Sequence, residues 1–80
     1  MTQWEILVRT HNRIYYIRDC RGHCSEYNAF DIVHRDEPHT IAPNRKFALE
    51  VRDAYIAWAE KYAPAGLAVL GDVVTRKVER

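Results

Sequence analysis

The chain has 80 residues, enough for one small domain, and 48% of them are hydrophobic, which excludes a disordered polypeptide. Its formal net charge of +1 gives no overall drive toward nucleic acid. No apolar run reaches the roughly 18 residues that span a bilayer, and no segment resembles a secretory signal. We therefore expect a single domain over residues 1–80 that is cytoplasmic, has no membrane partner and keeps its two cysteines as free thiols.

Residues 4–10 and 13–19 predict the two strands of a hairpin, because β-branched and large apolar side chains alternate along both segments. His11 and Asn12 separate the two segments. Since asparagine tolerates positive φ, this dipeptide favours a two-residue hairpin turn.

The predicted turn fixes the register of the hairpin, which can be checked by the chemistry of the paired residues. It places Leu7 opposite Tyr16 and Glu5 opposite Arg18, an apolar pair and a pair of opposite charges. Two further apolar pairs are Ile6 with Ile17 and Val8 with Tyr15. The predicted core face carries Trp4, Ile6, Val8, Tyr15 and Ile17, and the second face carries Glu5, Leu7, Arg9, Ile14, Tyr16 and Arg18.

The middle of the chain predicts a third strand. Residues 20–26 indicate a turn around Gly22, and residues 27–35 favour a strand that directs Phe30 and Ile32 inward. Residues 36–43 contain two prolines and indicate a loop.

Residues 44–63 predict a helix that begins at Asn44, a good N-cap residue, and ends before a proline. Its apolar residues form two stripes on roughly opposite sides. We expect the first stripe to be core and the second to be either covered by the C-terminal segment or exposed. The first consists of Phe47, Val51, Ala54, Tyr55, Trp58 and Tyr62, and the second of Leu49, Ile56 and Ala63. For residues 67–78 the sequence leaves a strand and a short helix open.

These elements predict an α+β fold in the order β-β-β-α-β, with a small antiparallel sheet and one amphipathic helix packed on one face. A single helix covers one side of a sheet, so the second face should stay open. An excess of exposed apolar surface on so small a domain indicates association, with a partner or as a homodimer. The apolar residues expected to remain accessible are Leu7, Ile14, Tyr16, Leu49 and Ile56.

Two clusters could hold a metal. Cys20, His23 and Cys24 could supply three zinc ligands, with His11, His34 or His39 as the fourth, although an ordinary turn with free thiols explains them equally. The second cluster, His34, Asp36, Glu37 and His39 with Asp31 nearby, could hold a divalent metal or supply a general base. A solvated loop accounts for the same residues. Neither pattern is complete, so we expect no metal and no other cofactor.

Other chemistry has little support in the sequence. The three glycines do not form a phosphate-binding loop, and Ser25 is the only serine. We therefore expect a protein that is not an enzyme. Arg9, Tyr16 and Arg18 on one sheet face could stack single-stranded nucleic acid. Glu5 shares that face, which argues against direct nucleic-acid binding.

A small β-rich domain with one helix, free cysteines, no catalytic motif and spare apolar surface resembles the small inhibitors carried by phages and mobile elements. Within that group the chain is most similar, in size and layout, to the anti-CRISPR proteins that act on type I systems. The resemblance rests on the whole chain and on no matched motif. It implies a non-enzymatic protein that binds the type I surveillance complex (Cascade) in the host bacterial cell and blocks recognition of target DNA.

We therefore expect the chain to bind a protein complex. The residues expected to contact it are Leu7, Arg9, Tyr16, Arg18, Asp36 and Glu37. Two other functions remain open at this point. The first is a nucleic-acid-binding regulator or a toxin–antitoxin component, and the second is a small zinc-binding module.

Overall fold

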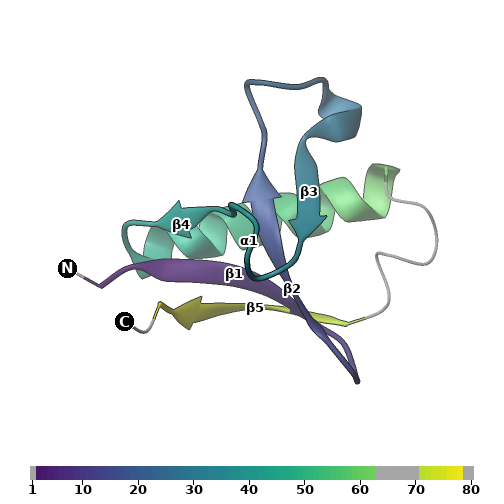
Figure 1. The fold of residues 1–80 in the computed structure, drawn as a ribbon. Helices are drawn as coiled ribbons and strands as arrows, with labels where there is room; N and C mark the ends of the chain where they lie inside the picture. Colours follow the sequence, from purple (N-terminus) through teal and green to yellow (C-terminus); the bar gives the residue numbers. More distant parts are fainter. Residues whose placement is uncertain (1, 63–70, 79–80) are drawn as a thin grey trace.

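Antiparallel strands and one long helix build the fold of the described residues, 2–62 and 71–78, in a computed structural model of the chain (Figure 1). The elements are β1 (Trp4–Arg9), β2 (Ile14–Asp19), the short 3₁₀ helix η1 (Glu26–Asn28), β3 (Phe30–Val33), β4 (Ile41–Ala42), α1 (Arg45–Tyr62) and β5 (Asp72–Lys77). The α+β class and the predicted order of elements are confirmed. The two-residue strand β4 is an addition, because residues 36–43 were expected to be loop throughout.

Strand β1 is the centre of the sheet. Strand β5 pairs with it along its whole length, from Trp4 opposite Lys77 to Arg9 opposite Asp72. Its other edge is shared by two strands, because β2 pairs with residues 7–9 and β4 with residues 4–5. In Figure 1, β2 and β3 rise away from β1, and β4 lies beside the first half of β1. The sheet is therefore split, and β4 occupies the split.

Two hydrogen bonds join β2 to Thr40, the residue that precedes β4. Its backbone N–H donates to the carbonyl of Ile17 at 3.1 Å. Its hydroxyl accepts from the backbone N–H of Asp19 at 2.7 Å. These bonds satisfy groups of β2 that no longer face β1, as buried backbone requires. The β3–β4 connection is therefore fastened to the sheet at its end.

The hairpin register is confirmed where the two strands pair, with Leu7 opposite Tyr16 and Val8 opposite Tyr15. The predicted pair of Glu5 with Arg18 is wrong, because the strands have already separated at that level. Glu5 instead lies opposite Arg76 of β5 and opposite Ile41 of β4.

The tip of the hairpin differs from the expected turn. Positive φ is confined to Gly22 among the described residues, so Asn12 does not adopt the conformation that the sequence suggested. The Thr10 side chain closes the turn instead. The Thr10 hydroxyl oxygen accepts from the backbone N–H of Arg13 at 3.0 Å. The backbone N–H of Thr10 donates to the Arg13 carbonyl at 2.8 Å.

Helix α1 begins where the sequence predicts, since the Asn44 side-chain oxygen accepts from the Phe47 N–H at 2.8 Å. The face that meets the sheet is narrower than expected. Its buried residues are Ala48, Val51, Tyr55 and Ala59. Phe47 is 42% exposed, so its assignment to the core is wrong. Small alanines at both ends let the helix approach the sheet closely, and this contact leaves Phe47 to the side.

The second stripe of α1, for which the sequence left burial and exposure open, is partly accessible. Ile56 is exposed and Leu49 is half-buried, whereas Ala63 lies outside the described residues. No helix in the described part of the chain is both long enough and apolar enough to cross a membrane.

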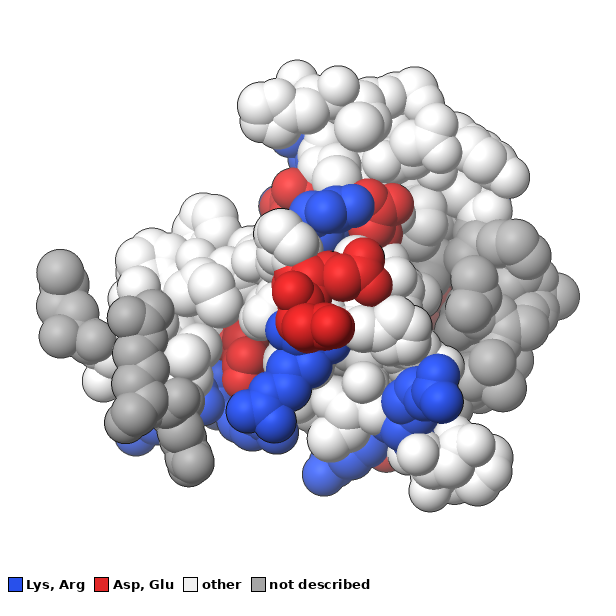
Figure 2. All heavy atoms as spheres, in the orientation of Figure 1, with Lys and Arg blue, Asp and Glu red and all other residues white. Residues whose placement is uncertain are grey.

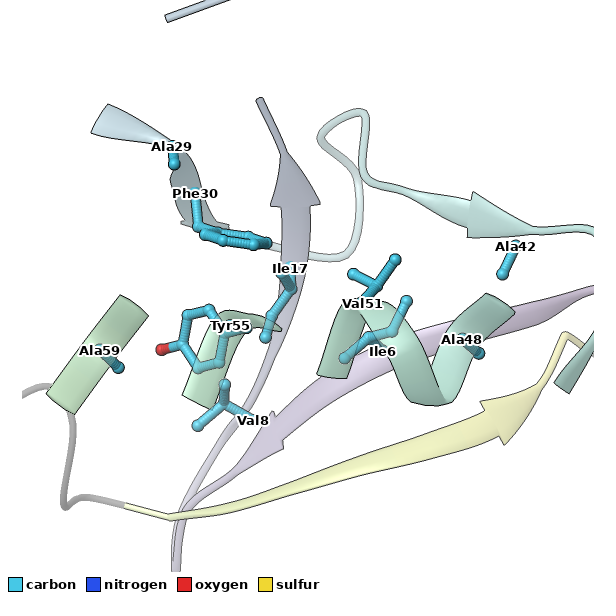
Figure 3. Packing of buried hydrophobic residues seen from close by; sticks show 10 residues of the cluster. All are labelled: Ile6, Val8, Ile17, Ala29, Phe30, Ala42, Ala48, Val51, Tyr55 and Ala59. Atoms are coloured by element: carbon cyan, nitrogen blue, oxygen red, sulfur yellow. The ribbon is translucent and has the colours of Figure 1, made fainter. Parts of the chain in front are cut away.

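The main core lies between α1 and one face of the sheet (Figure 3). In that view the side chains of Phe30, Tyr55 and Val8 point toward one another. The rings of Phe30 and Tyr55 meet edge to face, with centroids 5.6 Å apart, a favourable arrangement for aromatic pairs. Burial raises the pKa of the Tyr55 hydroxyl. The inward placement of Phe30 and Ile32 is confirmed, since Phe30 is buried and Ile32 packs against the same core.

The C-terminal segment is a strand over residues 72–77, which settles the choice between strand and helix for these positions; residues 67–70 lie outside the described part. Gly71 precedes this strand and runs close to β1. A Cβ atom added there would overlap the backbone carbonyl of Arg9. Gly22 has φ +87° but open space around it. The two glycines are therefore required for different reasons, close approach at Gly71 and backbone conformation at Gly22.

We expect Gly71→Ala to destabilise the fold by about 2–3 kcal/mol, because the added methyl group forces β5 away from the Arg9 backbone. Gly22→Ala should cost about 1 kcal/mol, the penalty of a left-handed conformation without a clash. Urea unfolding measures both values from the shift of the midpoint at constant slope. A Gly71→Ala variant that is as stable as Gly22→Ala would contradict the close packing of β1 against β5.

Candidate functional site

The sheet face opposite α1 carries a second apolar cluster. It consists of Leu7, Tyr16 and Val33, with Val74 packed against them from β5. Leu7 is 2% and Tyr16 5% exposed. The expectation that these two side chains lie exposed on an open face is therefore wrong. Ile14, at the edge of the same face, is exposed as expected.

The cover over this face is the β3–β4 loop, residues 34–40, which crosses in front of the sheet in Figure 1. Within it, the imidazole ring of His39 lies on the ring of Tyr16, with centroids 4.5 Å apart and planes at 40°. The sequence indicated a solvated loop here. It did not indicate that the loop folds back over the strands.

Below the loop lies a buried carboxylate. Glu5 is 7% exposed, and no other charged residue in the described part of the chain is buried. Arg76, opposite it on β5, donates from Nε and Nη2 to Glu5 Oε1 at 3.3 and 3.1 Å. Arg76 Nη2 also donates to the Tyr16 hydroxyl oxygen at 3.0 Å. The bonds to Glu5 and Tyr16 raise the pKa of the Arg76 guanidinium against the effect of burial.

His39 connects the same carboxylate to the loop. Its Nε2 lies 3.5 Å from Glu5 Oε2 and forms an ion pair with it when the imidazole is protonated. Its Nδ1 lies 3.1 Å from the backbone carbonyl oxygen of Glu37, an acceptor, and therefore donates to it. The Glu37 side chain accepts from the His34 N–H at 3.2 Å and closes the loop on itself. We call Glu5, Tyr16, His39 and Arg76 the Glu5 network.

A hollow of about 440 Å³ opens beside the Glu5 network. Its lining consists of Glu5, Tyr16, Arg35, His39, Ile41, Arg76 and Val78. These residues come from four strands or their flanking segments and from the loop. Figure 2 shows this side of the molecule, where acidic and basic side chains gather next to one another across the centre of the view. The surface that replaces the expected apolar face is therefore charged and hollowed.

The remaining predicted contact residues lie around this surface without forming one cluster. Asp36 and Glu37 are exposed on the loop. Arg18 is half-exposed and donates to Asp31 across β2 and β3, with Nη2 2.6 Å from Oδ2. Arg9 is exposed at the far end of β1 and does not line the hollow.

Sequence reasoning missed the roles of Arg35, His39 and Arg76. The sequence suggested His39 as a metal ligand and indicated no role for Arg35 or Arg76. The alternation of residues 72–77 would have placed Arg76 on the face of Glu5 if the pairing of β5 with β1 had been known. No local signal indicates that pairing.

Neither proposed metal cluster assembles. Among residues 2–62 and 71–78, no three histidine, cysteine, aspartate or glutamate side chains are arranged to hold a metal ion. Cys20 and Cys24 are free thiols, the first half-buried and the second exposed. Burial and the nearby Asp31 carboxylate raise the pKa of the Cys20 thiol.

Comparison with known proteins adds no relative. No protein-family model, curated protein or solved structure matches the chain. The function must therefore be inferred from the geometry and charge of the chain itself.

We expect a double-mutant cycle of Glu5→Gln and Arg76→Gln to give a coupling energy of about 1 kcal/mol in unfolding experiments, since one partner is buried and the other half-exposed. The matched control is the exposed pair of Arg52 and Asp53 on α1, whose side-chain atoms lie 2.9 Å apart. Its coupling should stay below about 0.5 kcal/mol. Equal coupling in the two pairs would mean that burial of Glu5 does not strengthen its contacts.

Proposed function

We propose that the chain is a non-enzymatic inhibitor that binds a protein complex through the outer surface of the 34–40 loop and the strands beside it. The observation that carries the proposal is the attachment of this loop. Two consecutive residues at its C-terminal end hold it: Thr40 is hydrogen-bonded to β2, and His39 lies on Tyr16 and beside Glu5. A loop that is already ordered loses little conformational entropy on binding, which favours its use as a contact surface.

The charges on this surface support a protein partner rather than nucleic acid. Asp36 and Glu37 project from the loop, and Arg35 stands next to them. Mixed charges of this kind select a complementary protein surface and accelerate encounter with it. A phosphate backbone would instead be repelled by the two carboxylates at the centre of the surface.

The resemblance to type I anti-CRISPR proteins suggests which protein complex is the partner. On this proposal the chain binds the type I surveillance complex and prevents it from recognising target DNA. The exposed contact residues differ from those that the sequence suggested, because Leu7 and Tyr16 are buried. Arg18, Arg35, Asp36 and Glu37 remain available on the surface.

The test uses purified type I surveillance complexes of several subtypes and labelled double-stranded target DNA. We expect the wild-type chain to inhibit DNA binding by at least one complex at near-stoichiometric ratios. Asp36→Lys should weaken the inhibition about tenfold, because it places a like charge against the basic surface that Asp36 meets. The matched control is Asp53→Lys on α1, an equally simple charge reversal on the opposite side of the sheet, which should inhibit like wild type.

Two results would contradict the proposal. One is the absence of both inhibition and retention of the complexes on the immobilised chain. The other is a gel shift of free DNA or RNA by the chain alone that weakens steeply with salt, which would favour a nucleic-acid-binding regulator.

A further inference from the structure

The hollow beside the Glu5 network has the chemistry of a site for one negative charge. Two guanidinium groups, those of Arg35 and Arg76, line it together with one carboxylate, that of Glu5. The carboxylate is already bound by Arg76 and faces His39. No ion pair joins Arg35 to a carboxylate within the described part of the chain. The hollow therefore presents a net positive charge whose source is Arg35.

Hydrogen-bond donors point to the same kind of ligand. Arg76 uses Nε and Nη2 toward Glu5 and Tyr16, which leaves the Nη1 donors of a half-exposed side chain for a ligand. The Tyr16 hydroxyl oxygen accepts from Arg76, which leaves the hydroxyl proton for donation to a ligand in the hollow. Planar, forked guanidinium donors match the two oxygens of a carboxylate.

The walls of the hollow favour a carboxylate on an aliphatic stem over a phosphate group. Ile41 is exposed and Val78 half-buried, and both line the hollow. They offer apolar contact to the methylene groups of an acidic side chain. A phosphate dianion would carry two charges toward a hollow with a single excess positive charge and would lie close to Glu5. The volume of about 440 Å³ holds an acidic side chain together with ordered water.

We propose that this hollow receives the carboxylate of an aspartate or glutamate side chain of the protein partner. The inference rests on the proposed function, since it assigns a contact to the same partner. It also explains why the surface combines Asp36 and Glu37 on the loop with a cationic hollow beside them. Such a surface fits a partner that carries an acidic side chain next to a basic patch.

The test uses the isolated, isotope-labelled chain and a small probe, N-acetyl-glutamate N-methylamide, followed by nuclear magnetic resonance. We expect saturable shifts of the His39, Ile41 and Arg76 signals, and no comparable shifts with the glutamine analogue of the probe. Arg35→Gln should raise the dissociation constant about fivefold, the effect of losing one charge-assisted contact at an exposed site. Arg13→Gln, at an exposed arginine outside the hollow, should leave binding unchanged.

A second variant keeps the test decisive if Arg35→Gln fails to fold. Tyr16→Phe keeps the ring that packs on His39 and removes the hydroxyl, so it should also weaken binding while the fold persists. The proposal is overturned by unsaturable or absent shifts, by equal shifts with the glutamine analogue, or by unchanged affinity in Arg35→Gln. Tighter binding of inorganic phosphate at the same residues would also overturn it in favour of a phosphate ligand.

The outcome is separable from that of the inhibition experiment, because the titration contains no CRISPR complex. Inhibition of DNA binding without probe binding would overturn the assignment of the hollow alone. Probe binding without inhibition of any complex would overturn the choice of partner and leave the hollow as a carboxylate site.

Discussion

The burial of Glu5 is the constraint on which the rest of the structure depends. A carboxylate that is 7% exposed loses hydration worth several kcal/mol, and this cost is offset only if its oxygens keep charged or hydrogen-bonded partners. Arg76 supplies them from the last strand, and His39, when its imidazole is protonated, supplies one from the loop between β3 and β4. One side chain of β1 therefore fixes the positions of two segments that lie far from it in the sequence.

The attachment of the loop changes the character of the sheet. Without the loop, the Tyr16 ring of the apolar cluster opposite α1 would lose the imidazole ring that lies on it. With His39 on Tyr16, the cluster is closed and charged side chains form the outer surface. Among the described residues, a seven-residue loop rather than a helix lies on the second face of the sheet. The proposed contact surface and the layer that buries the second cluster are the same segment.

The features that the sequence predicted correctly depend on residues that are close together along the chain. The hairpin register follows from the alternation of two adjacent segments, and the start of α1 follows from the N-cap at Asn44. What it could not predict depends on distant contacts. A two-residue strand such as β4 has no periodicity, and the partner of Glu5 on β5 is 71 residues away. The open face was therefore an error of topology, since the hairpin and the third strand had been recognised, but not the return of the loop between β3 and β4 to the sheet.

Amide hydrogen exchange at Thr40 measures whether Glu5 holds the loop on the sheet, because the Thr40 N–H donates to the Ile17 carbonyl only when the loop is fastened there. We expect slow exchange at Thr40 in the native chain and rapid exchange at the exposed Asp36. Glu5→Gln should accelerate exchange at Thr40 more than at Val51 in the buried face of α1. Exchange at Thr40 as rapid as at Asp36 in the native chain would mean that the loop is not held on the sheet.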